Sequence, residues 1–496
     1  MGYNNKKKKE ERARKINEFF HDVEADGNLE QMEAVRKIFR TNENLFITGK
    51  AGTGKSTFLR RLKPLLEKTC VVAPTGIAAL NIEGVTIHSL FSFDVSPFIP
   101  KIEDGKFTDN ANSFVKKDKY RTVASMETLI IDEVSMLRAD LLDRIGSALR
   151  RIKNSDLPFG GVRIIMFGDL SQLPPVFRGD FNLYDYYDTK FFFSSKSLMA
   201  SGYSVIEFKR VYRQNDERFI NSLNSIRDGS FTKEDEDLFR SRIIGNDLIP
   251  TNSIYICSTN AESKSINDMN LANVEGPVFE FEAMMHDNYP KDAPCEQLLT
   301  LKIGARVIIT KNGAGYVNGS LGVVTDIRYV PVLDENGEPV RDKKTNEVKQ
   351  ERVIFVRIDG HDKDTKIPVE TWSNMQYTVV YGELVGVELG SITQYPIRLG
   401  YSISAHKSQG MTLESAIIKM DRAFEPGQIY TAISRCKSLD GLYLTSMIDA
   451  KRVGMDPEVK KFWENVHENN GQIKPVPMEE LEDSLNGKSL KDLLDF

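Results

Sequence analysis

The segment FITGKAGTGKSTF, residues 46–58, restricts the fold of this chain more than any other stretch of its sequence. An apolar run at 44–48 leads into it, and a helical pattern with an apolar face follows at 55–67. Glycines let the turn between them adopt unusual backbone angles and point its N–H groups inward. The pattern predicts a strand, a tight loop and a helix of an α/β unit, with Pro64 ending or kinking the helix.

The same segment contains the spacing G-x-x-x-x-G-K-S, which predicts a site for a nucleoside triphosphate. The inward N–H groups and the helix N-terminus both favour an anion. We expect Lys55 to reach the β- and γ-phosphates and Ser56 to ligate Mg²⁺. The residues expected to line this site are Gly49, Gly52, Thr53, Gly54, Lys55, Ser56 and Thr57. The alternative is a glycine-rich turn without a ligand, which the strand-loop-helix context disfavours.

A second apolar run, residues 128–131, ends in Asp132 and Glu133. In open α/β sheets, ligands bind at the carboxyl ends of the strands. We expect Asp132 to hold Mg²⁺ through water and Glu133 to polarise the attacking water as general base. Two acids at the end of a strand are common, so the prediction depends on the nucleotide loop upstream.

The composition excludes several classes of protein. There is no apolar run of 18 residues, so we expect no membrane span. The N-terminus lacks the apolar core of a signal peptide. The net charge of −5 neither requires nor forbids nucleic acid, because binding depends on where basic residues cluster. The basic run Lys6–Lys9 has three readings: a DNA-contacting arm, a localisation signal or a solvated, frayed end.

The order of patterns along the 496 residues predicts an α/β protein of about three domains. We expect two α/β units, the second opening with a strand at 205–208. Each unit carries an insertion: a polar stretch in the first, and β segments separated by turns, typical of a small barrel, in the second. The predicted segments are a loosely ordered basic N-terminus at 1–28, the units at 29–200 and 201–448, their insertions at 92–120 and 311–393, and a charged helix with an acidic tail at 449–496.

Three further motifs carry chemistry near the predicted nucleotide. In GDLSQLPPV, which follows a strand, Gln172 can hydrogen-bond the γ-phosphate or its attacking water; the alternative is a polar turn. Arg213 in VYRQ and Arg435 in YTAISR are candidates for an arginine that reaches a phosphate held by the other unit. Arg210 competes with Arg213 for that role, and single arginines are usually surface ion-pair partners.

Turns on the same rim of the predicted sheets are suited to gripping a polymer backbone. APTGIAA offers Thr75 and Gly76, and HKSQG offers His406 and Lys407, as phosphate contacts. In TIHSLF, His88 and the aromatic residues Phe91 and Phe93 can stack on bases or hydrogen-bond to them; the alternative is a core cluster with a satisfied histidine.

Taken in order, these motifs resemble those of superfamily 1 DNA helicases of the 5′-to-3′ class, the Pif family most closely and RecD-like helicases next. The matching motifs span about residues 29 to 445: GKAGTGKST, APTGIAALN, TIHSLF, DEVSM, GDLSQLPPV, VYRQ, YVNGSLGVV, AHKSQGMTLE and YTAISR. The resemblance implies two RecA-like domains with ATP between them. It places a strand-separating pin at 92–120 and an SH3-like domain at 311–393.

The resemblance also implies roles for individual positions. Gln31 corresponds to the glutamine that reads adenine, which makes ATP the expected fuel. The residues expected to act in catalysis are Lys55, Glu133, Gln172, Arg213 and Arg435, with Ser56 and Asp132 holding Mg²⁺. The residues expected to contact single-stranded DNA are Thr75, Gly76, His88, Pro175, His406 and Lys407.

The implied activity is ATP-driven translocation 5′-to-3′ on single-stranded DNA and unwinding of forked or tailed duplex, in replication, repair, recombination or telomere maintenance. An alternative is a translocase that mainly strips proteins from DNA. A P-loop kinase or GTPase is a rival from another class, and the chain lacks the N-K-x-D guanine reader. We expect a monomer without membrane association, cytoplasmic in a bacterial or viral source and nuclear in a eukaryotic one. The end of the tail, 489–496, is a candidate docking peptide for a replication partner, and an unstructured tail is the alternative.

Overall fold

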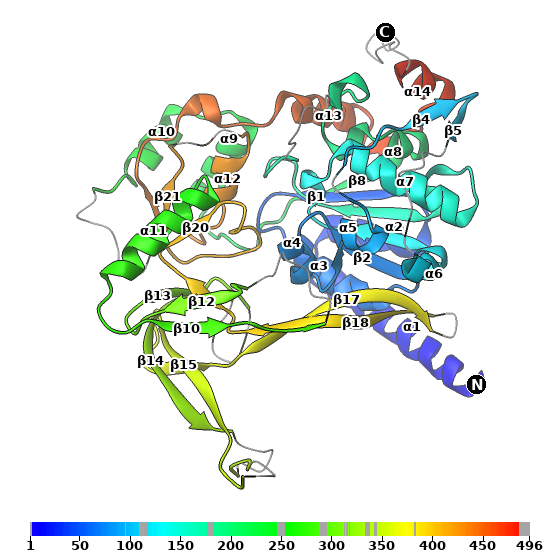
Figure 1. Cartoon of the computed structure of the whole chain (residues 1–496). Helices are drawn as coiled ribbons and strands as arrows, with labels where there is room; N and C mark the ends of the chain where they lie inside the picture. The colour runs from blue at the N-terminus through cyan, green and yellow to red at the C-terminus, as the bar shows by residue number, and fades with distance from the viewer. Residues whose placement is uncertain are drawn as a thin grey trace.

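The structure of the chain is a computed structural model (Figure 1). The residues that it describes are 2–94, 96–108, 115, 117–175, 183–245, 253–287, 295–311, 313, 316, 318–332, 338–341, 345–380, 383–421, 423 and 425–485. The side chains of Lys6–Lys9 and the candidate docking peptide at 489–496 lie outside the described residues. Among the described residues, no helix is both long and apolar enough to cross a bilayer.

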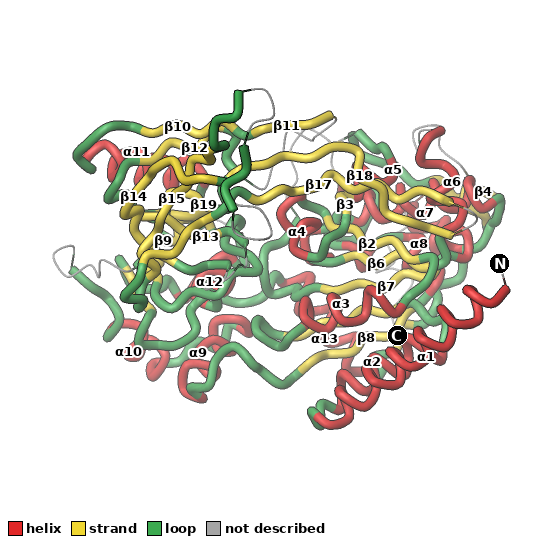
Figure 2. Tube along the Cα trace, turned by 90° about the horizontal axis from the view of Figure 1, so that it is seen from below, coloured by secondary structure: helices red, strands yellow, loops and turns green. Residues whose placement is uncertain are grey.

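The first unit is built on a seven-stranded sheet with the order β23-β8-β1-β7-β6-β2-β3 (Figure 2). All neighbours are parallel except the edge strand β23. The strands are β1 (Leu45–Gly49), β2 (Thr69–Ala73), β3 (Val85–Thr86), β6 (Thr128–Ile131), β7 (Arg163–Phe167), β8 (Tyr203–Phe208) and β23 (Gln472–Ile473). Near-continuous apolar runs such as Leu45–Gly49 form these strands because helices bury both faces of a parallel sheet.

Helices cover both faces of this sheet. They are α1 (Gly2–Ala25), α2 (Leu29–Arg40), α3 (Lys55–Leu62), α4 (Gly76–Asn81), α5 (Ile87–Phe91), α6 (Lys117–Ser125), α7 (Ala139–Lys153) and α8 (Lys196–Ser201). The helix after the nucleotide loop ends at Leu62, and a 3₁₀ turn that contains Pro64 follows it. The predicted break at Pro64 is therefore confirmed.

The second unit has a parallel four-stranded sheet with the order β20-β9-β21-β22. Its elements are β9 (Ile254–Cys257), β20 (Ser402–Ser404), β21 (Ala416–Lys419), β22 (Leu442–Leu444), α9 (Glu217–Asp228), α10 (Lys233–Arg240), α11 (Asn260–Asn273) and α12 (Gln428–Ile433). The prediction that a strand at 205–208 opens this unit is wrong: β8 pairs with β1 in the first sheet. A parallel strand reads the same in either sheet, so its sequence could not distinguish them.

The β region of the second unit is longer than the predicted 311–393, because it starts at Phe279 and ends at Leu399. Its strands are β10 (Phe279–Glu282), β11 (Met284–Asp287), β12 (Leu298–Leu301), β13 (Arg306–Ile309), β14 (Leu321–Pro331), β15 (Gln350–Ile358), β16 (Asp364–Ile367), β17 (Glu370–Val380), β18 (Glu383–Gln394) and β19 (Ile397–Leu399). The long β17–β18 hairpin reaches back to α6 of the first unit (Figures 1 and 2).

The C-terminal segment, predicted as an appended helix and tail, instead completes the first unit. After the second unit, α13 (Pro457–Glu468) packs Phe462 and Trp463 into the first core. The strand β23 then adds to the edge of the first sheet. Finally α14 (Met478–Leu485) lies against the hairpin of β4 (Lys101–Glu103) and β5 (Lys106–Thr108), which occupies the predicted insertion at 92–120.

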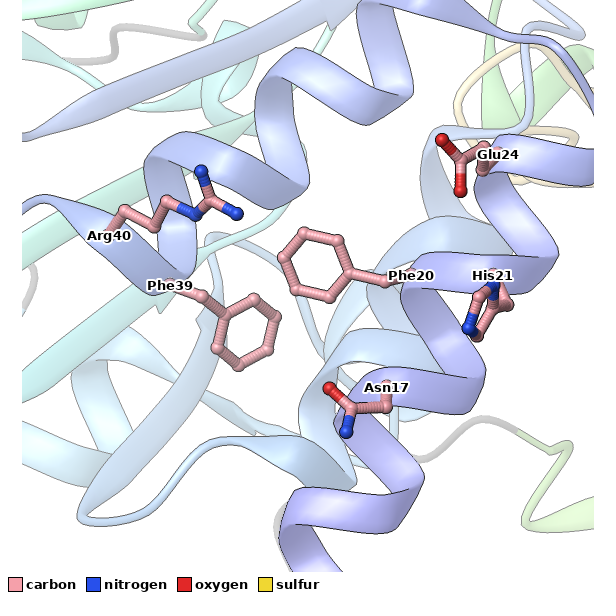
Figure 3. Close-up of a pocket in the computed structure, with 6 residues that line it drawn as sticks. All are labelled: Asn17, Phe20, His21, Glu24, Phe39 and Arg40. Atoms are coloured by element: carbon pink, nitrogen blue, oxygen red, sulfur yellow. The ribbon is translucent and has the colours of Figure 1, made fainter.

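The N-terminal segment is also ordered where we expected a loose, polar end. Residues 2–25 form α1, and the apolar residues of its second half, Phe19 and Val23, are buried on α3 and α2. A pocket of about 430 Å³ lies between α1 and α2, lined by Asn17, Phe20, His21, Glu24, Phe39 and Arg40 (Figure 3). The spacing of Ile16, Phe19, Phe20 and Val23 is a helical apolar stripe, which the many charged residues around it obscured.

Replacing Phe19 by alanine is expected to destabilise the first unit by about 3–5 kcal/mol, since the ring is buried and removing it leaves a cavity. Its centroid lies 5.6 Å from that of Phe58, on the helix that follows the nucleotide loop. Urea unfolding followed by circular dichroism measures the change. Arg14→Ala, on the exposed face of the same helix, is the control and should shift stability by less than about 0.5 kcal/mol. Equal shifts for both would mean that α1 is not docked.

Candidate functional site

The nucleotide loop joins β1 to α3 and is covered by the connection between the two units. Gly52 and Gly54 have φ of +81° and +83°, a region that side chains disfavour. A Cβ on Gly52 would lie 2.6 Å from Cβ of Arg213, and the Tyr212 N–H donates to the Gly52 carbonyl at 2.8 Å. The connection that carries Tyr212 and Arg213 therefore lies directly on the loop.

Lys55, the first residue of α3, folds back over the loop. Its Nζ donates to the carbonyl oxygens of Gly49 at 2.6 Å and Lys50 at 3.0 Å. Burial lowers the pKa of Lys55, while the charges of Asp169 and Glu133 oppose this shift. The ammonium group thus lies beside carboxylates that follow the ends of two neighbouring strands.

Asp132 and Glu133 follow β6 as predicted. Burial, reinforced by the charge of Glu133, raises the pKa of Asp132 to about 7. Burial also raises the pKa of Glu133, against the opposing charges of Lys55 and Arg435. Carboxylates that are this costly to ionise gain from a cation. With the exposed hydroxyl of Ser56 across the loop, these oxygens fit Mg²⁺, which prefers carboxylate and hydroxyl ligands.

Gln172 lies beyond the end of β7 and is held by a residue that the sequence analysis did not select. Its Nε2 donates to Oδ2 of Asp169 at 3.0 Å, and both side chains are buried. A Cβ on Gly427, which precedes α12, would lie 2.3 Å from the Gln172 carbonyl oxygen. The backbone at Gln172 is therefore in contact with the second unit.

Two arginines from the other side complete this group, of which Arg435 is buried and Arg213 is half-buried. Arg435 donates through Nε to the Thr431 carbonyl at 2.8 Å, and burial lowers its pKa, against the attraction of Glu133. Arg213 donates to the Ser434 carbonyl at 3.0 Å, and burial together with the charge of Arg435 lowers its pKa to about 9. Two like charges buried together favour an anion between them. Arg210, the competing candidate, is exposed and pairs with Asp26.

A possible base-binding end lies at the other side of the loop. Gln31 is buried on α2, and its Nε2 would lie 3.7 Å from a Cβ on Gly54; the Tyr212 ring would lie 3.6 Å from the same point. The Tyr212 hydroxyl accepts from Nδ2 of Asn28 at 3.1 Å. Tyr212 has 42% of its surface exposed, and the guanidinium carbon of the exposed Arg210 lies 5.1 Å from its ring centroid, so a base that stacks on this ring takes the place of that side chain. The sequence analysis missed it, although it directly precedes Arg213.

Other residues that the sequence analysis missed also join the units at this site. Tyr430, on α12, accepts a hydrogen bond from the Ala51 N–H of the nucleotide loop at 3.0 Å. Gln214, next to Arg213, donates to the Cys436 carbonyl at 3.0 Å. A tyrosine within an apolar helix and a glutamine in a loop gave no sequence signal of these contacts. The pocket between α1 and α2 shares none of these residues and lies outside the site (Figure 3).

The predicted strand-gripping turns of the two units meet. Thr75 and Gly76 begin α4, and His406 and Lys407 lie in the turn after β20. A Cβ on Gly410 in that turn would lie 3.1 Å from Nδ2 of Asn81, at the end of α4.

The other predicted contacts are less exposed. His88, on α5, is half-buried, and burial lowers its pKa. Phe91 and Phe93 are buried and stack on each other with centroids 5.3 Å apart. They belong to the core, as the core-cluster alternative predicted, and the prediction that they stack on bases is wrong. Pro175 is buried at the edge of the described residues.

Comparison with known proteins places this geometry in one family. The family description "PIF1-like helicase" matches residues 28–237. The human ATP-dependent DNA helicase PIF1 is 32% identical over 451 residues, 88% of this chain and 63% of the human protein. This chain therefore spans less than two thirds of the length of that relative.

Two solved structures of a bacterial relative are similar to this chain, and the alignments cover nearly the whole of the relative's chain. Pif1 from Bacteroides sp in complex with ADP-AlF4 is 36% identical, with a TM-score of 0.76 over 90% of this chain and 98% of that one. Bacteroides Pif1 bound to ssDNA is 35% identical, with a TM-score of 0.62 over the same shares. The two parallel sheets described above are the cores of the two RecA-like domains that the sequence analysis expected. With its motifs, its two sheets and these relatives, the chain belongs to the PIF1-like helicase family.

Proposed function

We propose that this protein is an ATP-dependent DNA helicase that moves 5′-to-3′ along single-stranded DNA and unwinds duplex. The observation that carries the proposal is the convergence of Lys55, Glu133 and Asp169 of the first unit with Arg435 of the second unit and Arg213 of the connection between them. A γ-phosphate bound there touches both units, so its loss changes the contact between them. The complexes of the Bacteroides relative with ADP-AlF4 and with ssDNA support both ligands.

The chain's own residues divide the work of hydrolysis. The N–H groups of the loop and Lys55 hold the phosphates, and Ser56 and Asp132 hold the metal. Mg²⁺, when bound, neutralises charge that develops on the β- and γ-oxygens. Glu133, whose carboxyl lies near the charges of Lys55 and Arg435, takes the proton of the attacking water. Gln172 orients that water, and Arg213 and Arg435 stabilise the charge that spreads over the γ-phosphoryl group.

Movement follows if the two units grip the strand alternately. Thr75 and Gly76 contact it from the first unit, and His406 and Lys407 from the second, where the two turns meet at Gly410. His88 and Pro175 extend the track, and the insertion at 92–120 acts as the pin at the fork. Each base-pair step costs about 1.4 kcal/mol of stacking, well within the free energy of one ATP.

The experiment that tests the proposal is ATP turnover with and without oligo-dT, followed by strand separation on duplexes with a 5′ or a 3′ tail. The helicase predicts strong stimulation and unwinding only from the 5′ tail. Stimulation without unwinding, together with displacement of a protein bound to the strand, would favour a translocase that remodels protein–DNA complexes. Turnover indifferent to oligo-dT would exclude both. We also propose that the protein is a monomer and that it acts in replication, repair or recombination. Light scattering tests the oligomeric state.

Replacing Tyr212 by alanine is expected to raise KM for ATP by about 10-fold, because stacking of a base on an aromatic ring contributes about 1–3 kcal/mol. Tyr212→Phe keeps the ring and loses only the hydroxyl contacts with Asn28 and Asp26, so its KM should change by less than about twofold. Steady-state kinetics on both variants measures the difference. If Tyr212→Ala leaves KM unchanged, the base does not bind at this end of the loop.

A further inference from the structure

A buried arginine outside the site described above crosses the boundary between the units. Arg227 lies near the end of α9 in the second unit and is 5% exposed. Its helix is fixed in place: the Asp216 side chain caps the start, and Phe219 and Ile226 are buried in the second core. Arg227 therefore moves with the second unit as a rigid part of it.

The partners of Arg227 belong mainly to the first unit. Its NH2 lies 3.8 Å from Oδ1 of Asp169 and 3.5 Å from Oε1 of Glu207, which is on β8. Its NH1 lies 3.7 Å from Oδ1 of the neighbouring Asp228. All three distances exceed a normal hydrogen bond, and Nε is buried without a hydrogen-bond partner among the described residues. The guanidinium is thus held by ion pairs with three carboxylates, while its N–H groups make few hydrogen bonds.

A buried charge held this loosely is costly for stability alone, since desolvation offsets the attraction of the pair. Its placement, in contrast, suits a function. The Asp169 carboxylate that faces Arg227 through Oδ1 accepts the Gln172 amide through Oδ2 at 3.0 Å. A continuous chain of contacts therefore runs from α9 of the second unit to the side chain that orients the attacking water.

We propose that Arg227 is a positioning residue that makes the orientation of Gln172 depend on how the second unit sits against the first. This inference rests on the proposed ATP hydrolysis. When the units approach, the guanidinium closes onto Asp169 and fixes the carboxylate, and the carboxylate in turn fixes the Gln172 amide toward the γ-phosphate. When the units separate, Asp169 keeps the Ser171 N–H and the nearby charge of Lys55 but loses the guanidinium, so the Gln172 amide is held less firmly. Hydrolysis is thereby restricted to the closed arrangement.

A double-mutant cycle tests this chain of contacts. Arg227→Gln should lower kcat by at least about 10-fold while KM for ATP changes less than about threefold, because the phosphate loop is untouched. Gln172→Ala should lower kcat as well. If Arg227 acts through Gln172, the double variant is no slower than the slower single variant, whereas independent effects multiply. Multiplied effects, or a fall in kcat/KM caused by KM alone, would overturn the proposal.

Two further variants separate positioning from folding. Arg227→Lys keeps a charge that can reach Asp169 and should recover part of the lost kcat. Asp228→Asn removes the third, half-exposed partner of the same guanidinium and should leave kcat within about twofold. If Arg227→Gln does not fold, as judged by thermal unfolding, Arg227→Lys replaces it in the cycle, with a smaller loss of kcat and the same test of additivity.

The outcome stays distinct from that of the proposed function. The cycle uses ATP turnover of the whole chain at saturating oligo-dT, and it can be run at basal turnover if DNA has no effect. If oligo-dT does not stimulate ATP turnover of the wild-type chain, the helicase proposal is wrong. The Arg227 cycle is then still decided by whether the effects of its two variants multiply. If DNA stimulates the wild-type chain but the effects of the two variants on kcat multiply, only the proposed role of Arg227 is wrong.

Discussion

Glu133→Gln is expected to bind ATP and fail to hydrolyse it, with kcat lower by about 10²–10⁴-fold and nucleotide affinity retained. The amide keeps the size of the side chain and cannot take a proton from water. It also removes an acid whose charge helps to raise the pKa of Asp132, so the folded protein should not lose stability. Single-turnover hydrolysis, with fluorescent-ATP binding measured in parallel, separates the two effects.

The matched control for this variant is Glu127→Gln. Glu127 lies just before the same strand, at its other end, with its side chain 63% exposed and paired with Lys68. Its turnover should equal that of the wild type. If Glu133→Gln retains more than about a tenth of wild-type kcat, another group is the base, and Asp132 would be the next to examine.

Arg435→Ala is expected to have the second large effect, a fall in kcat of about 10³-fold or more, as for other arginines that reach a γ-phosphate across an interface. Arg435 is 2% exposed, and its charge opposes the rise in the pKa of Glu133, so we expect it to lie near the γ-phosphate. Lys437→Ala, two residues along and half-exposed, is the control for general loss of charge. Quenched-flow measurement gives the rate constant of the chemical step, separately from product release.

The same variant distinguishes the roles of the two arginines. Arg435→Ala removes a like charge beside Arg213, so the pKa of Arg213 rises and its binding to phosphate should not weaken. We therefore expect KM to change little when kcat falls. A large rise in KM with kcat preserved would assign Arg435 to ground-state binding and leave Arg213 as the residue that acts in the transition state.

The sequence located the chemistry better than the architecture. The loop at Gly49–Ser56 and the acids at 132–133 are local patterns, and their structure follows from spacing alone. Arg213 and Arg435 were candidates from their motifs that the resemblance favoured, and Gln31 came from the resemblance alone; the structure brings all three to the loop or its partner acids. Their catalytic roles remain predictions.

What the sequence could not provide are the contacts between distant segments. The assignment of β8 to the first sheet depends on strand order, which a short apolar run does not encode. Asp169 and Tyr212 matter because of their partners at Arg227 and Gly54, which lie far from them in the sequence. A lone aspartate or tyrosine in a loop gives no pattern from which such a partner can be predicted.

The return of the chain to the first sheet has a mechanical consequence. The chain crosses to the second unit through residues 209–216 and crosses back through 445–456, so the second unit is tethered at two points. A rigid body held at two points rotates mainly about the line that joins them, and it resists other rotations and translation. Because the first crossing carries Tyr212 and Arg213, it lies directly on the nucleotide loop. A change in that loop is then passed to the second unit as rotation about one fixed axis.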